Sequence, residues 1–465
     1  MSTVAADVRN QKQIFGHPSG LFLLFFTEMW ERFSYYGMRA LLVLYMVGDA
    51  LHPESSLIKR AQAGAVHVFG FAGLRHGIEA VFGPLATQPL ASEIYGLYTA
   101  LVYLTPLFGG YLADRVIGQR KSVVIGGALM AIGQFLLMSE AMFVFGLLFL
   151  ILGNGFFKPN ISTQVGGLYP EGDPRMDRAY TIFYAGINLG AFFSPLICGT
   201  LGQLYGWKYG FMSAGIGMVC GLMLYLWGQK FLAPDQLAKS KVAHTEKAPI
   251  TRAQWNAIIG LIVLGVFNIV FWMVYEQGGN TLQIFADRNT NWNFFGISVP
   301  STWYQALNPM CIFLLVPILN MFWGWQSRNK KEPSSVTKMA MGCALLGLSF
   351  SPLIFVSRGM TEGTRISLLW MVGSTFIYTL GELYLSPIGL ALVVKIAPPR
   401  LVSMLMGVWY LFIFAGNYLA GFIGTFYTAM SHSTFFLMLL GFALASSFAI
   451  FALQKPLKNA VGHST

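Results

Sequence analysis

The sequence places four charged side chains and two tyrosines within one apolar segment near its start, residues 21–46. Their spacing puts all six on one face of a helix; they are Glu28, Glu31, Arg32, Tyr35, Tyr36 and Arg39. Ionisable groups are costly inside a bilayer and persist where they face one another or a water-filled cavity. The stripe therefore predicts a polar pathway through a membrane, with carboxylates that could bind and release protons.

The composition indicates an integral membrane protein. Of the 465 residues, 55% are hydrophobic and only 11% are charged, whereas about a quarter of the residues are charged in soluble domains. A helix needs about 20 apolar residues to cross a bilayer. Twelve such segments follow one another, at 20–47, 91–113, 121–140, 142–167, 178–203, 208–231, 254–277, 301–326, 336–357, 366–396, 401–428 and 432–454. We therefore expect an all-α membrane fold with twelve transmembrane helices.

The connection between the sixth and seventh segments divides the chain. The stretch from Lys230 to Arg252 carries Pro234, Pro249 and five basic residues, and we interpret 233–253 as a cytoplasmic linker between two six-helix bundles, 1–232 and 254–465. Most of the 30 lysines and arginines lie in the termini and in the connections on the same side, so the positive-inside rule places both termini in the cytoplasm. This asymmetry accounts for the net charge of +11 without nucleic-acid binding.

The first connection, 48–92, is unusually long. Its part from 61 to 82 mixes apolar residues with Arg75, His76 and Glu79. We expect a lateral or interfacial helix there. A thirteenth span is the alternative, which the internal charges and the many glycines and prolines disfavour.

Charged side chains recur in later segments. Beyond the first segment, Lys158 lies in the fourth, Glu276 at the end of the seventh and Glu382 in the tenth. One charged helix in every three is the pattern expected if three-helix repeats line a cavity between two pseudo-symmetric halves. The opposite charges predict two gating ion pairs, Arg39 with Glu276 and Lys158 with Glu382, which protonation of the carboxylate would release. Such pairs can also serve only to register packed helices.

Several motifs resemble those of proton-dependent oligopeptide transporters, a family of the major facilitator superfamily. The residues from Glu28 to Gly37 match the family signature E-x-x-E-R-F-x-Y-Y-G, and the segments 155–160, 183–190 and 381–387 extend the match. The resemblance implies the major facilitator fold and symport of di- and tripeptides with protons by alternating access. It also implies a transporter without cofactors rather than an enzyme.

The same resemblance implies roles for individual residues. The proton-coupling residues would be Glu28, Glu31, Arg32 and Glu276. The residues expected to contact the peptide are Arg39, Tyr35, Tyr36, Tyr103, Lys158, Asn188, Asn308, Tyr378, Glu382 and Trp409. Arg39 and Lys158 would receive the peptide carboxylate, and Glu382 the ammonium group. The opposite charges of the substrate, at a fixed separation, would then be recognised rather than its side chains.

The chain departs from many bacterial members of that family, which carry two extra helices between the sixth and seventh spans. The connection 231–252 has no room for them, so we expect twelve spans without the extra pair. We expect a functional monomer in the bacterial inner membrane, with peptides, protons and lipid as partners and no metal.

Three alternative functions remain. The nearest is proton-coupled transport of nitrate or another small anion, but retention of Glu28 and Glu31 beside Arg32 favours peptide. A channel would prefer a continuous polar file on several helices to opposed charge pairs. An intramembrane hydrolase would need a nucleophile and a base, for which we find no G-x-S-x-G or H-E-x-x-H motif.

Overall fold

The computed structural model describes residues 11–170, 172–233, 251–294, 296–361, 363–398 and 401–461. All structural statements below concern these residues. The expected linker, 233–253, lies outside them except at its two ends.

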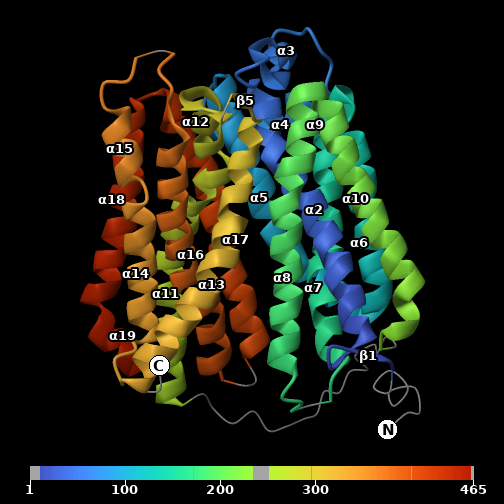
Figure 1. The fold of residues 1–465 in the computed structure, drawn as a ribbon, viewed down its shortest axis with the longest axis vertical. Helices are drawn as coiled ribbons and strands as arrows, with labels where there is room; N and C mark the ends of the chain where they lie inside the picture. The colour runs from blue at the N-terminus through green and yellow to red at the C-terminus, as the bar shows by residue number, and fades with distance from the viewer. Residues whose placement is uncertain are drawn as a thin grey trace. The chain divides into compact units, whose positions relative to one another are not determined.

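A helix occupies each of the twelve apolar segments expected from the sequence (Figure 1). In the first half of the chain the helices are α2 (Ser19–Val47), α5 (Thr87–Leu112), α6 (Gln119–Leu136), α7 (Phe143–Gly167), α8 (Met176–Ser194), α9 (Thr200–Tyr205) and α10 (Trp207–Gly228). In the second half they are α11 (Arg252–Tyr275), α12 (Thr281–Asn289), α13 (Tyr304–Arg328), α14 (Ser335–Leu348), α15 (Ser351–Ser357), α16 (Leu368–Ile396), α17 (Val402–Gly424), α18 (His432–Ala452) and α19 (Gln454–Val461).

Nine helical segments within the described part of the chain are long and apolar enough to cross a membrane. The helices α2, α5 and α6 are not among them. In α2 the reason is its content of charged residues, which are the same ones that first suggested a polar pathway. The exact number of spans therefore belongs to the proposal below.

The chain divides into two compact units, which are described separately. The first comprises Met1–Thr87, Leu101–Val242 and Val299–Ala306, and the second comprises Gln88–Ala100, Ala243–Ser298 and Leu307–Thr465. Two helices are shared between the units, because α5 is divided after Ala100 and α13 after Ala306.

In the first unit, α2 packs against α8 and α10, and α6 packs against α7 (Figure 1). Small residues allow the close contact of α6 with α7. A Cβ added to Gly126 would lie 2.6 Å from the carbonyl oxygen of Gly153, so the two backbones touch. Small residues at helix crossings are a usual means of packing helices within membranes.

In the second unit, α14 packs against α16 and α18, and α11 packs against α17 (Figure 1). The contact of α14 with α16 again uses glycine, since a Cβ added to Gly342 would lie 2.9 Å from the carbonyl oxygen of Gly381. This packing fixes the helix that carries Glu382.

The long first connection contains two short helices, α3 (Leu57–Gln62) and α4 (Phe71–Phe82). The helix expected over 61–82 is therefore shorter than expected. The chain is interrupted where Gly64 and Gly70 adopt φ angles of +72° and +77°, which other residues rarely adopt. The 12 residues of α4 extend about 18 Å, less than the hydrocarbon thickness of about 30 Å.

Three pairs of two-residue strands complete the described part of the chain. They are the antiparallel pair β1 (Gln13–Ile14) and β2 (His17–Pro18), the parallel pair β3 (Thr290–Asn291) and β6 (Ile366–Ser367), and the antiparallel pair β4 (Asn293–Phe294) and β5 (Ile297–Ser298).

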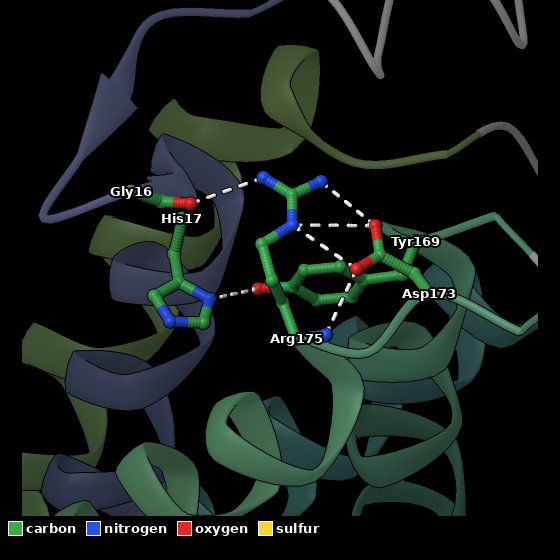
Figure 2. A network of polar contacts seen from close by, with 5 residues as sticks. All are labelled: Gly16, His17, Tyr169, Asp173 and Arg175. Atoms are coloured by element: carbon green, nitrogen blue, oxygen red, sulfur yellow. Dashed lines mark hydrogen bonds and ion pairs between the residues drawn. The ribbon is translucent and has the colours of Figure 1, made fainter.

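A polar network fixes the hairpin that precedes α2 (Figure 2). Nδ1 of His17 lies 2.8 Å from the hydroxyl of Tyr169. Arg175 donates a hydrogen bond of 3.0 Å to the carbonyl oxygen of Gly16 and forms an ion pair of 2.7 Å with Asp173. Hydrogen bonds from Arg175 lower the pKa of Asp173 to about 2. The connection between α7 and α8 thus holds the start of the helix that carries the charged stripe.

Candidate functional site

The charged stripe lies on α2, which is closely enclosed by α8 and α10. A Cβ added to Gly190 of α8 would lie 2.2 Å from the carbonyl oxygen of Met29, and one added to Gly221 of α10 would lie 2.9 Å from Cβ of Trp30. These glycines let the backbones of α8 and α10 approach the part of α2 that carries the acids.

Two carboxylates share one guanidinium on this part of α2. Glu28, Glu31 and Arg32 are all buried, with exposed fractions of 2%, 0% and 4%. Nε of Arg32 lies 3.1 Å from Oε1 of Glu28 and also hydrogen-bonds Oε2 of Glu31. The remaining carboxylate oxygens, Oε2 of Glu28 and Oε1 of Glu31, have no hydrogen-bond partner among the described residues. Buried polar atoms without partners are unusual, so these oxygens are available for a proton.

Lys158 supplies a second positive charge to the cluster. It lies on α7, within electrostatic range of both Glu28 and Glu31. Its Nζ stands 4.4 Å from the ring centroid of Tyr103, which comes from α5. Close contact of α5 with α7 makes this possible. A Cβ added to Gly109 would lie 2.0 Å from the carbonyl oxygen of Gly155.

The tyrosines of the stripe contact the arginines on either side of them. The guanidinium of Arg32 lies 5.3 Å from the ring centroid of Tyr35, and that of Arg39 lies 5.9 Å from the ring of Tyr36. The two tyrosine rings meet edge to face, with centroids 5.2 Å apart. Cation–π contacts of this kind hold a guanidinium without neutralising its charge. The contacts with the tyrosine rings therefore leave the positive charge of each guanidinium in place.

Asn188, which the sequence analysis assigned to the peptide ammonium group, lies on α8 in the same unit. It is buried, with an exposed fraction of 5%. Its Nδ2 donates a hydrogen bond of 3.0 Å to the carbonyl oxygen of Tyr184, one turn earlier in the same helix.

The second unit brings together Glu382 and Asn308, which were expected to act together. Nδ2 of Asn308, on α13, donates a hydrogen bond of 2.8 Å to Oε2 of Glu382 on α16. The same nitrogen lies 3.1 Å from Oγ1 of Thr379. A charge-assisted hydrogen bond of this length orients a carboxylate.

Glu276 is buried in the second unit, with an exposed fraction of 2%. It lies in the turn η6 (Glu276–Gly279), which directly follows α11. The hydroxyl of Tyr95, from the part of α5 in this unit, donates a hydrogen bond of 3.3 Å to Oε2 of Glu276. Tyr95 is absent from the site residues expected from the sequence, because it lies 181 positions from Glu276.

Tyr378 and Trp409, expected as walls of a substrate pocket, are both buried in the second unit. Tyr378 stacks on Tyr275 with ring centroids 4.6 Å apart and donates a hydrogen bond to the carbonyl oxygen of that residue. Trp409 packs against α16, where a Cβ added to Gly389 would lie 2.7 Å from its indole ring. Both rings are thus fixed in position.

Glu93 is absent from the site residues expected from the sequence. This carboxylate lies on α5, near the start of the second expected span, so the pattern of one charged helix in three was wrong. Its side chain is buried, with an exposed fraction of 1%. The signal was present in the sequence, since Glu93 lies inside the segment 91–113.

The predicted site residues fall into one group in each unit. The first unit holds Glu28, Glu31, Arg32, Tyr35, Tyr36, Arg39, Tyr103, Lys158 and Asn188, and the second holds Glu276, Asn308, Tyr378, Glu382 and Trp409. Each predicted gate pair takes one residue from either unit and remains a prediction. Across the described ranges, no group of three or more His, Cys, Asp or Glu side chains is placed to hold a metal ion.

Comparisons with known proteins give a consistent result. The sequence profile of the POT family matches residues 120–259 and 250–439. The chain is 34% identical to an uncharacterized transporter of Bacillus subtilis, YclF, over 86% of either chain. It is 32% identical to a di-/tripeptide transporter of Lactococcus lactis subsp. cremoris, over 87% of this chain and 88% of that protein.

A solved structure agrees over nearly the whole length. The crystal structure of a mutant peptide transporter POT in complex with alafosfalin is 32% identical, with a TM-score of 0.84 and 98% of both chains covered. Together with the long apolar helices, these matches show a membrane transporter of the major facilitator type rather than an enzyme. The chain belongs to the POT family.

Proposed function

We propose that this protein carries di- and tripeptides together with protons across the bacterial inner membrane. The observation that carries the proposal is the buried cluster of Glu28, Glu31 and Arg32 beside Lys158, with Glu382 oriented by Asn308 in the other unit. The relative from Lactococcus lactis is named a di-/tripeptide transporter, and the similar solved structure holds alafosfalin.

The substrate would be recognised by its two ends. Arg39 and Lys158, with Tyr35, Tyr36 and Tyr103 beside them, would receive the peptide carboxylate. The contacts of Arg39 with Tyr36 and of Lys158 with Tyr103 support this assignment, because they hold the cations in place without adding negative charge.

The amino end of the peptide would go to Glu382, with Asn308 and Asn188 accepting further hydrogen bonds. The hydrogen bond from Asn308 to Glu382 supports this role, since a carboxylate held in one orientation binds an ammonium group with less loss of freedom. Tyr378 and Trp409 would form rigid apolar walls for the peptide side chains.

Proton coupling would follow from competition for positive charge. Glu28 and Glu31 together carry two negative charges, which Arg32 and Lys158 balance. A proton on one of the carboxylates would remove one negative charge and leave Lys158 available for the peptide carboxylate. Because these groups interact closely, they would titrate as a coupled set.

The transport cycle would use the two pairs predicted from the sequence as gates. Arg39 with Glu276 and Lys158 with Glu382 would close opposite sides in turn, and protonating the carboxylate would weaken each pair. Glu276 would be helped by Tyr95, which already donates a hydrogen bond to it.

The arrangement in the membrane would be twelve spans in two six-helix bundles, 1–232 and 254–465, joined by the linker 233–253. Both termini would lie in the cytoplasm, and the protein would work as a monomer. The positive-inside distribution of lysine and arginine supports this orientation. Each charge that crosses the full potential releases about 2.3 kcal/mol per 100 mV, enough for roughly fiftyfold accumulation.

Uptake of labelled dialanine into liposomes that contain the purified protein tests this proposal. We expect accumulation above the external concentration when the outside is acidic and the inside negative, and its loss on adding a protonophore. Uptake that only equilibrates under the same gradient would contradict symport. Inhibition by nitrate but not by other dipeptides would instead support the transport of a small anion.

A further inference from the structure

Glu93 is a buried carboxylate for which the proposed mechanism has no use. Its exposed fraction is 1%. Its Oε1 has no hydrogen-bond partner within the described part of the chain. Burying a charged group without a polar partner is costly, because nothing replaces the water that would solvate the charge.

Glu93 lies where the backbones of α5 and α17 are in direct contact. A Cβ added to Gly96 would lie 2.5 Å from Cα of Gly421. A Cβ added to Gly421 would lie 2.8 Å from the carbonyl oxygen of Ser92 and 3.3 Å from Cα of Glu93. The two backbones therefore touch at the residue that carries the acid, which leaves no room for water between them.

The same crossing is stabilised by neutral hydrogen bonds. Oγ of Ser92 donates a hydrogen bond of 2.9 Å to Oδ1 of Asn280, which follows η6. Nε2 of Gln88 donates a hydrogen bond of 3.0 Å to the carbonyl oxygen of Gly424 at the end of α17. The segment that carries Glu93 is therefore fixed to α17 and η6 without any contribution from a charge on Glu93.

The titratable groups around Glu93 offer it no positive charge. On α17, Tyr418 lies within electrostatic range of Glu93. The acid of η6 is Glu276, which accepts a hydrogen bond from Tyr95 of α5. Tyr98 is the other titratable residue of this part of α5. None of these groups carries a positive charge, so none of them could form an ion pair with an ionised Glu93.

We propose that Glu93 is a proton-binding site, and that its proton is taken up when α5 and α17 close against each other. This inference rests on the proposed proton-coupled transport. In the proposed topology the start of α5 faces the outside, so external water would reach Glu93 when the crossing opens. The ionised form then accepts an external proton, and only the neutral form is buried again. An acidic exterior therefore favours closure of the outer side.

The dependence of uptake on external pH tests this site. Dialanine uptake into liposomes is measured at several external pH values, with the internal pH and the membrane potential held constant. One proton bound on closure changes the closing equilibrium up to tenfold per pH unit. Glu93→Gln imitates the protonated acid and cannot bind a further proton. We therefore expect its uptake to change less with external pH than that of the wild type, by a factor of up to ten per pH unit. The membrane potential should still drive uptake by this variant.

Two variants and one direct measurement complete the test. Ser92→Ala removes the neighbouring hydrogen bond but no titrating group, and it should keep the pH dependence of the wild type. If Glu93→Gln also keeps that dependence, the site is refuted. If Glu93→Gln does not fold, wild-type protein is treated with a carbodiimide, which modifies protonated carboxyls in apolar surroundings. Mass spectrometry should then find Glu93 modified at neutral pH, and its absence from the modified residues would refute the site.

Failure of this inference can be distinguished from failure of the proposed function. Wild-type protein that shows no proton-driven uptake would contradict the proposed function. Wild-type uptake driven by protons, together with an unchanged pH dependence in Glu93→Gln, would contradict only the role of Glu93. The carbodiimide measurement does not depend on transport at all.

Discussion

Replacing Asn308 by alanine should weaken peptide binding through its effect on Glu382. Asn308 donates a hydrogen bond of 2.8 Å to Oε2 of Glu382. Hydrogen bonds to charged groups contribute about 1.5–3 kcal/mol, and we take the lower end because Glu382 is only partly buried. A loss of about 1.5 kcal/mol corresponds to about a tenfold rise in KM for dialanine.

The assay compares dialanine with N-acetyl-dialanine, which lacks the ammonium group. Wild-type protein should prefer dialanine, and Asn308→Ala should lose about a factor of ten of that preference, as worked out above from the hydrogen bond. Thr379→Val is the matched control. It removes only the neutral contact of 3.1 Å to the same nitrogen, so a smaller change is expected. An Asn308→Ala protein that keeps the wild-type preference would refute the assignment of Glu382 to the ammonium group.

Two further substitutions test the packing and the stability of the fold. Gly96→Ala should abolish uptake and peptide exchange, because the added Cβ would lie 2.5 Å from Cα of Gly421. The control Gly441→Ala should transport normally, since its Cβ meets nothing within 4 Å. Normal transport by Gly96→Ala would contradict the close crossing. Asp173→Asn should lower the Tm in detergent equally at pH 5 and pH 8. The pKa of Asp173 is lowered to about 2, so its stabilising charge is complete above about pH 4 and is lost only as the pH falls towards 2. A deficit in Tm that changes between pH 5 and pH 8 would contradict this reasoning.

Local features of the site could be predicted from the sequence. The helical period alone places Glu28, Glu31 and Arg32 on one face, because residues three and four positions apart are neighbours on a helix. The ion pair of Arg32 with Glu28 follows from the same period, since the two lie four positions apart, whereas the contact of Arg32 with its sequence neighbour Glu31 does not. The resemblance to known transporters added Asn308 and Glu382, which the structure joins by a hydrogen bond.

Contacts between distant parts of the sequence could not be predicted in this way. Tyr95 and Glu276 are separated by 181 positions, and no local pattern connects them. The crossing of Gly96 with Gly421 could not be predicted either. A glycine within a helical sequence does not reveal which residue packs against it or how closely. The position of Glu93 inside an apolar segment is visible in the sequence, but the burial of its side chain depends on that crossing.

The ends of the lateral helix could have been predicted more closely. The segment from 61 to 82 was expected to form one helix, but the structure has α4 from Phe71 to Phe82. Gly70 immediately precedes it and Gly83 immediately follows it, each with a φ of +77°. Glycines at these positions are a known signal for the end of a helix, although the apolar pattern alone passes over them.

Proton-driven accumulation by Glu31→Gln tests the coupling assignment most directly. Glu31 has an exposed fraction of 0% and hydrogen-bonds Arg32, so glutamine keeps the shape of the side chain but cannot exchange a proton. We predict that this variant loses accumulation of dialanine under a proton gradient and retains part of the exchange of labelled for unlabelled peptide. Accumulation at the wild-type level would contradict proton coupling through the cluster of Glu28, Glu31 and Arg32.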